Sequence, residues 1–132
     1  MVSYVMSIKK KYGMNLLEGR SLWEYRRRRS RIDIGDKIIL YATVPDRELI
    51  GEFIVGKIII GNSDEVWEKT KGDVCYSLDE VLPYLKSGKF PIAFQVTKPH
   101  IYQKPIELSK IPFFKPPMSY CKASDQLLSK LI

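Results

Sequence analysis

The run ELIGEFIVGKIII, from Glu48 to Ile60, constrains the fold of this chain more than any other segment. Its length and apolar composition indicate a core β-strand, which Gly51 and Gly56 interrupt. Glycine inside a strand is typical of a bulge or a bend. A long strand that bends at glycines is what a small, strongly coiled β-barrel requires. The run therefore predicts a mostly β fold built around a small barrel.

Four further segments have the alternation or the apolar composition of β-strands. These segments are Ser3 to Ile8, Leu22 to Arg27, Lys37 to Thr43 and Phe90 to Thr97. Residues 34–36 predict a turn into the third segment, and residues 44–47 predict a turn out of it. The expected order is strand, helix, three strands, two short helices, strand and tail, which is an α+β arrangement dominated by strands.

Short helices are predicted between these strands. The first covers Tyr12 to Leu17 and is closed by Gly19. Two capping boxes, in which the first and fourth residues exchange hydrogen bonds, begin the next two helices. They are formed by Asn62 with Glu65 and by Ser77 with Glu80.

The C-terminal half of the chain carries most of the prolines. Pro83 is expected to kink or split the helix that contains it, because proline lacks the N–H that the helix uses. The segment from Pro105 to Pro117 is expected to wrap the barrel as an ordered loop. A short C-terminal helix is expected at about residues 123–132.

The net charge of +7 is confined to the first 31 residues. That stretch holds nine basic and two acidic residues, whereas the remainder holds thirteen of each. The nine are Lys9, Lys10, Lys11, Arg20, Arg26, Arg27, Arg28, Arg29 and Arg31. Such an asymmetry predicts an anionic partner and an association that weakens with salt. Charge alone does not specify the anion, and a protein with an acidic face would satisfy it as well as RNA would.

Length and composition restrict the class of protein. The 132 residues match one domain, so a single domain over residues 1–132 is expected. The chain starts apolar and then turns basic, the reverse of a secretory signal, and no apolar run reaches membrane-spanning length. We therefore expect a cytoplasmic protein without a membrane partner. Cys75, Cys121 and the lone His100 lack zinc-site or disulfide spacing, so neither a metal nor a cofactor is expected. Few Asn and Gln beside abundant Lys, Glu and Ile are typical of a thermophilic source.

Four segments occur in the order and spacing of a known family. They are LLEGRSLWEYR with the basic loop behind it, GDKIILYAT, IGEFIVGKI, and the proline-proline-x-serine-aromatic motif at residues 116–120. Together they resemble the ASCH domain family of the PUA-like superfamily, from Met6 to about Tyr120. The resemblance implies a small β-barrel flanked by short helices, with a cleft along one side. It also implies binding of RNA or a nucleotide, as a single strand or through a modified base.

The resemblance implies enzymatic chemistry for some members only. One branch hydrolyses acetylated cytidine, and other members have been described as ribonucleases. The amidohydrolase branch has a catalytic lysine two residues after a glycine and a nucleophilic threonine three residues later. Here those positions are Ser21 and Glu24, although Gly19 and Arg26 match the family pattern. That mechanism does not transfer, so a binding module is expected, with a role in RNA metabolism or in regulating transcription or translation. The alternative is a hydrolase of a modified nucleoside, or a ribonuclease, in which Glu24 is catalytic.

The expected site is a basic cleft in which arginine forks contact phosphate. Its predicted residues are Lys9, Lys10, Lys11, Arg20, Ser21, Glu24, Arg26, Arg27, Arg28, Arg29, Arg31, Ser119 and Tyr120. Strand alternation places Glu24 and Arg26 on one face, where they either form an ion pair or contact a ligand. Trp23 and Tyr25 face the other way, and core packing is favoured for them over base stacking. The alternative for the arginine run is a solvated loop.

Overall fold

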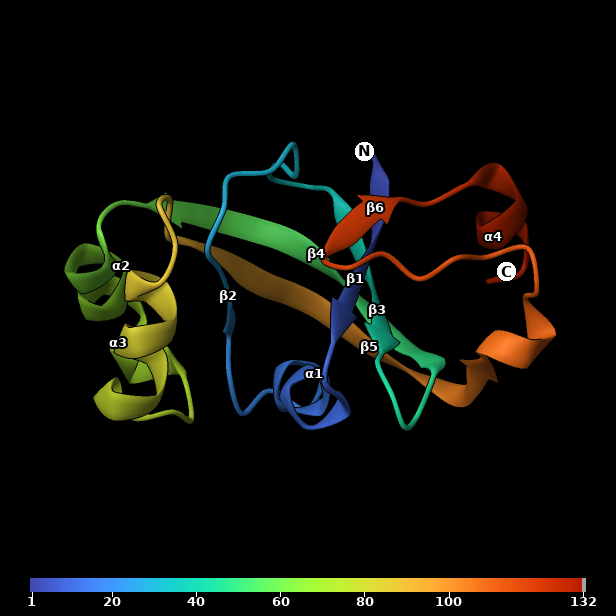
Figure 1. The fold of residues 1–132 in the computed structure, drawn as a ribbon, viewed down its shortest axis with the longest axis horizontal. Coiled ribbons are helices and arrows are strands. Elements are labelled where there is room, and N and C mark those ends of the chain that lie inside the picture. Colours follow the sequence, from blue (N-terminus) through green and yellow to red (C-terminus); the bar gives the residue numbers. More distant parts are fainter. Residues whose placement is uncertain (132) are drawn as a thin grey trace.

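The computed structural model describes residues 1–131, which form a curled six-stranded sheet with short helices around it (Figure 1). In order across the sheet, the strands are β2 (Trp23–Arg26), β5 (Ile92–Glu107), β4 (Glu48–Ile60), β3 (Lys37–Ala42), β1 (Ser3–Ile8) and β6 (Tyr120–Lys122). β1 and β3 run parallel, and the other neighbouring strands run antiparallel. The sheet forms a half-barrel, which confirms the predicted mostly β fold with flanking helices. The short strand β6 was not predicted.

β4 has the bounds that its apolar run predicted, and it is bent. Its pairing with β5 is irregular between Leu49 and Gly51 and again between Val55 and Ile58, which marks bulges near both predicted glycines. A Cβ added at Gly51 would lie 2.5 Å from the carbonyl oxygen of His100. Only glycine permits so close an approach of two backbones, so this bend depends on Gly51.

β5 is longer than predicted. A strand over residues 90–97 and a loop from Pro105 were expected, whereas β5 continues through Pro99 and Pro105 to Glu107. β2 pairs only with Ile92 to Gln95, so the rest of that edge of β5 has no strand partner within residues 1–131. Proline is tolerated on an open edge because the N–H that it lacks would have faced no neighbour there.

The helices are α1 (Lys10–Leu17), α2 (Ser63–Thr70), α3 (Leu78–Lys86) and α4 (Asp125–Ser129), with 3-10 turns η1 (Lys71–Asp73) and η2 (Leu108–Lys110). Both capping boxes are confirmed, and Gly19 follows α1 with a φ of 80°, as a helix-closing glycine does. None of the helices within residues 1–131 has the length and apolar character needed to cross a membrane.

Two helices differ from the prediction in part. A kink or a split was expected at Pro83, and α3 is not split there. The carbonyl that loses its partner there belongs to Asp79, and both residues are exposed, so water can satisfy it. α4 is shorter than the predicted 123–132 because Ser124 caps its start, accepting a hydrogen bond from the Leu127 N–H at 3.1 Å. Ile132 lies outside the described residues.

The central strands β1 and β3 are buried on both faces. Met6 and Leu40 point into the half-barrel, where α1 packs, whereas Val5 and Ile39 point to the outer face, which the C-terminal segment covers. Burial on both faces explains why these strands have continuous apolar sequences.

A third core joins the sheet to a pair of helices. Trp23 and Tyr25 of β2 pack with Trp67 of α2 and Leu85 of α3. Figure 1 shows α2 and α3 at one end of the molecule and α4 at the opposite end. β2 therefore lies between the half-barrel and the helical pair, and its second face is left to form a site.

Candidate functional site

β2 separates its side chains into a structural pair and a polar pair. Trp23 and Tyr25 are buried, and the Tyr25 hydroxyl lies 2.6 Å from the Thr70 hydroxyl of α2. Core packing is therefore confirmed for both aromatic residues. Glu24 and Arg26 face the other way, and the ion pair that alternation allowed is present, with Arg26 Nη2 at 3.0 Å from Glu24 Oε2.

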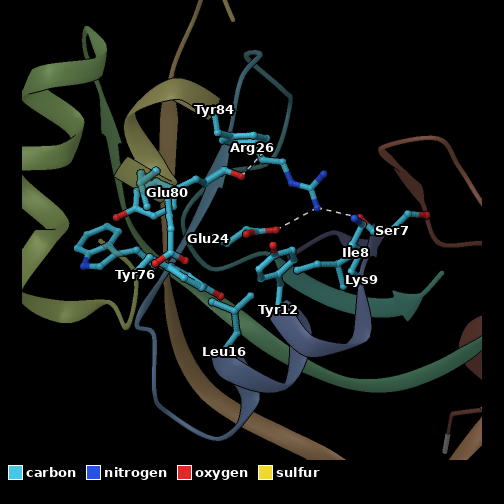
Figure 2. A pocket seen from close by; sticks show the side chains of 13 residues that line it. Ser7, Ile8, Lys9, Tyr12, Leu16, Glu24, Arg26, Tyr76, Glu80 and Tyr84 are labelled. Carbon is cyan, nitrogen blue, oxygen red and sulfur yellow. Dashed lines mark hydrogen bonds and ion pairs between the residues drawn. The ribbon is translucent and has the colours of Figure 1, made fainter. Parts of the chain in front are cut away.

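The Glu24–Arg26 pair is shielded from solvent. The side chains of Glu24 and Arg26 keep only 13% and 17% of their accessible surface. Burial raises the pKa of Glu24, and the adjacent guanidinium offsets only part of this effect. Arg26 Nη2 also donates to the carbonyl oxygen of Ser7 at 3.0 Å, which fixes the guanidinium between β2 and β1 (Figure 2). Arg26 Nε is buried and has no hydrogen-bond acceptor within residues 1–131.

A cavity of about 390 Å³ opens over Glu24, and we call it the aromatic pocket. Its walls include Tyr12 of α1, Tyr84 of α3 and Tyr76 just before that helix, with Glu24 and Arg26 among the lining residues (Figure 2). Tyr12 and Tyr76 meet edge to face at 5.8 Å between ring centroids. The volume is in the range of pockets that hold small organic ligands, and flat aromatic walls suit a planar ring.

A second cavity, of about 500 Å³, lies on the other side of Arg26 and Tyr84, and we call it the arginine pocket. It is lined by Arg26 to Arg29 and by Met118 to Tyr120 of the late motif. Two of its guanidinium groups rest on aromatic rings, Arg27 on Tyr84 at 5.0 Å and Arg29 on Phe90 at 5.1 Å. Within residues 1–131, no carboxylate lies within 4.0 Å of Arg27, Arg28 or Arg29, so their charges are uncompensated.

Ser7 connects the late motif to the buried ion pair. Its hydroxyl donates to the carbonyl oxygen of Pro117 at 2.6 Å, and its N–H donates to the carbonyl oxygen of Ser119 at 2.8 Å. Because the Ser7 carbonyl holds Arg26, one residue of β1 joins segments that are more than 80 positions apart in the sequence. Neither Ser7 nor Tyr84 was among the predicted site residues, and nothing in the local sequence distinguishes them.

The other predicted residues are distributed unevenly. Lys9 lines the aromatic pocket, and Lys11 is exposed with its ammonium 4.9 Å from the Tyr12 ring. Arg31 is exposed just beyond the arginine pocket, and its backbone N–H donates to the Tyr120 hydroxyl at 3.4 Å.

Like Lys11 and Arg31, three further predicted residues line neither pocket. Lys10 forms ion pairs with Asp46 and Glu48, and Arg20 pairs with Glu18 at 2.6 Å. Ser21 is fully buried, and its hydroxyl accepts from the Cys75 N–H at 3.1 Å. The positive surplus of the N-terminal stretch is thus partly neutralised. Within residues 1–131, the basic residues of this stretch without an acidic partner are Arg27, Arg28, Arg29 and Arg31 around the arginine pocket and Lys9 and Lys11 around α1.

Comparison with solved structures shows the same fold in other proteins. The ASCH protein of Zymomonas mobilis superposes with a TM-score of 0.88 at 22% identity, over 98% of this chain and 92% of that one. A tyrosine-to-phenylalanine mutant of that protein gives 0.89 at 21% identity, over 99% and 96%. The N-terminal domain of Staphylothermus marinus McrB gives 0.60 at 11% identity, over 97% and 93%. At these identities the likeness concerns the fold alone.

Sequence comparison with curated proteins finds the ATP synthase subunit alpha of Ureaplasma parvum, 30% identical over 86 residues. The match spans 64% of this chain but only 11% of the length of that protein. The model of the ASCH domain, in contrast, matches residues 6–109, which is well over half of the chain. The protein therefore belongs to the ASCH domain family.

Proposed function

We propose that this protein binds RNA or a nucleotide, with a base in the aromatic pocket and phosphate in the arginine pocket. The observation that carries the proposal is the meeting of these two pockets at Arg26 and Tyr84. A nucleotide has the same division, a flat and nearly uncharged ring joined through ribose to an anion. PUA-like folds often bind RNA, which supports the same class of ligand.

Charge decides which pocket receives which part of the ligand. In the aromatic pocket, Glu24 compensates Arg26, and a phosphate there would meet a desolvated carboxylate at close range. Like charges repel strongly where water is excluded. In the arginine pocket, Arg27 and Arg29 are held by ring stacking with N–H groups left to donate, and such planar forks suit phosphate oxygens.

The salt dependence of RNA binding tests the proposal. We expect a short single-stranded RNA to bind in a fluorescence anisotropy titration, with log K falling steeply as log salt rises. Replacing Arg28 and Arg29 together by alanine should weaken binding for every RNA sequence and reduce the slope by about one unit for each phosphate that the variant no longer binds. A slope that does not change would remove these arginines from the interface.

A matched control separates a local effect from a change in net charge. Lys69 and Lys130 are exposed and border neither pocket. Replacing both by alanine removes the same two charges, and the slope should remain close to that of the unmodified protein. Equal losses in the two double variants would indicate a diffuse attraction without a defined phosphate site.

One observation favours a second candidate function, a hydrolase of a modified nucleoside or a ribonuclease. Glu24 is a buried carboxyl with a raised pKa at a pocket wall, and such groups are typical of general acid–base catalysts. Incubation with acetylated cytidine and with short RNAs tests this candidate. Turnover that is lost in Glu24→Gln but kept in Arg29→Ala would support it, and the absence of turnover would leave binding as the function.

A further inference from the structure

Glu24 and Arg26 both line the aromatic pocket, and each has hydrogen-bonding capacity that is not used within residues 1–131. Glu24 Oε2 accepts from Arg26, but a carboxylate has about four acceptor positions, so capacity for a ligand N–H remains. Arg26 Nε carries an N–H that is buried and has no acceptor within residues 1–131. A buried donor without a partner is costly and rare, and a ligand atom is one way to satisfy it.

Every unmodified nucleobase offers the complementary pair of atoms on one edge. On the Watson–Crick edge an N–H donor lies beside an acceptor: the amino group and ring nitrogen in adenine and cytosine, the ring N–H and a carbonyl oxygen in guanine and uracil. The donor would meet Glu24, and the acceptor would meet Arg26 Nε. The pair therefore distinguishes the edge of a base rather than the identity of the base.

The arrangement of the two pockets favours the same edge. In a nucleotide, the Watson–Crick edge points away from the ribose and its phosphate. A base that directs this edge at Glu24 therefore directs its ribose outward. Tyr84 borders both pockets, so the phosphate can pass it and reach Arg27 and the arginines that follow.

We propose, resting on the nucleotide-binding function above, that the Glu24–Arg26 pair recognises the Watson–Crick edge of a single unpaired base. A paired base is excluded because its partner already occupies that edge. A base that is methylated at its ring N–H, such as N3-methyluracil or N1-methylguanine, is excluded because the methyl group replaces the donor and would meet a buried carboxylate. The protein thus selects unpaired nucleotides that keep an N–H donor on this edge, with little preference among the four bases.

Three uridine nucleotides provide a matched test, because they carry the same charge and the same phosphate. They are uridine 5′-monophosphate, its N3-methyl derivative and its C5-methyl derivative. The N3-methyl group blocks the Watson–Crick donor, whereas the C5-methyl group adds the same volume elsewhere on the ring. Titrations followed by NMR shifts of the labelled protein report weak affinities directly. We expect N3-methylation to weaken binding by about tenfold or more, because a hydrogen bond to a charged group is lost, and C5-methylation to change it little.

The variant Glu24→Gln sharpens the test, because glutamine keeps the size of the side chain and can still accept from Arg26. Its amide then presents an N–H to the base instead of a carboxylate oxygen. The penalty for N3-methylation should shrink towards none in this variant. A penalty of the same size in both proteins would show that the methyl group clashes elsewhere, and it would overturn the assignment to Glu24.

The outcomes separate this inference from the function on which it rests. If all three nucleotides bind equally well to the unmodified protein, recognition of the Watson–Crick edge is wrong and nucleotide binding stands. If none of the three binds, and RNA does not bind either, both proposals are wrong. If only the N3-methyl nucleotide binds poorly and Glu24→Gln removes the difference, both are supported.

Discussion

The aromatic pocket and the arginine pocket share Arg26 and Tyr84, but they differ in whether their charged side chains have partners of opposite charge. In the first, a carboxylate and a guanidinium form a desolvated pair 3.0 Å apart. In the second, Arg27 to Arg29 have no acidic partner within residues 1–131, and two of them rest on aromatic rings. A buried ion pair holds its two side chains in one conformation. Positive charges at the surface that have no acidic partner attract anions over longer distances. Arginines of one run therefore lie in two different electrostatic environments, and the acidic partner of Arg26 makes the difference.

Breaking the buried pair should have the largest effect. Glu24→Ala leaves the Arg26 charge desolvated and alone, and we expect the free energy of unfolding to fall by about 3 kcal/mol. Arg28→Ala, in the arginine pocket, should change it by less than about 0.5 kcal/mol. Chemical denaturation of the two variants measures both values. Similar losses would mean that the two pockets do not differ in the way described.

A smaller effect is expected from keeping the charge of the arginine pocket while changing its shape. Replacing Arg27 and Arg29 by lysine preserves two positive charges but removes the planar forks that stack on Tyr84 and Phe90. RNA binding should weaken by roughly tenfold, about 1.4 kcal/mol, with the salt slope unchanged. Arg47→Lys, outside both pockets, is the control and should bind as before. Full affinity in the double variant would show that the pocket acts only as a cluster of point charges.

The third effect is a pH dependence that belongs to the aromatic pocket alone. Burial raises the pKa of Glu24 in the folded protein, so the folded state holds this proton at a pH where the unfolded chain has released it. Stability should therefore fall as the pH rises from the ordinary glutamate pKa through the raised one, and then level off. Denaturation measured across this range for the unmodified protein and for Glu24→Gln isolates the contribution. Parallel curves would assign the pH dependence to other groups.

The smallest effect is expected at Tyr84, which lines both pockets. The Tyr84 hydroxyl donates to the carbonyl oxygen of Tyr25 at 3.3 Å, and its ring supports Arg27. Tyr84→Phe keeps the ring and should cost about 0.5–1 kcal/mol of stability with little change in RNA affinity. Tyr84→Ala, which removes the wall of both pockets, should weaken RNA binding as well. Anisotropy titrations of both variants measure whether RNA affinity depends on the ring of Tyr84 or on its hydroxyl.

Local patterns predicted the strands β1 and β4, both capping boxes and the opposite faces of Glu24 and Trp23 in β2. Each of these depends on residues only a few positions apart. The same reasoning predicted too short a β5, because proline normally ends a strand. The sequence does not show that this part of β5 lies at an open edge of the sheet, where proline is tolerated. This reasoning also missed β6, whose three residues become a strand only by pairing with β1.

The features of the candidate site also fall into two groups, those that residue order predicted and those that it did not. Residue order alone was enough to place Glu24 and Arg26 on one face and to identify a stretch with excess positive charge. It could not show that Lys10 and Arg20 are neutralised by acidic partners. It also could not show that Tyr84 completes both pockets.

The sequence by itself determined the class of fold, the family and the presence of a basic segment, because strand alternation, helix caps and charge are properties of neighbouring residues. Only the tertiary structure decided which charges remain uncompensated and which aromatic rings surround Glu24. Compensation and burial depend on side chains from distant segments, such as Ser7 holding both Arg26 and the late motif. Those contacts exist only once the sheet has curled and brought the segments together.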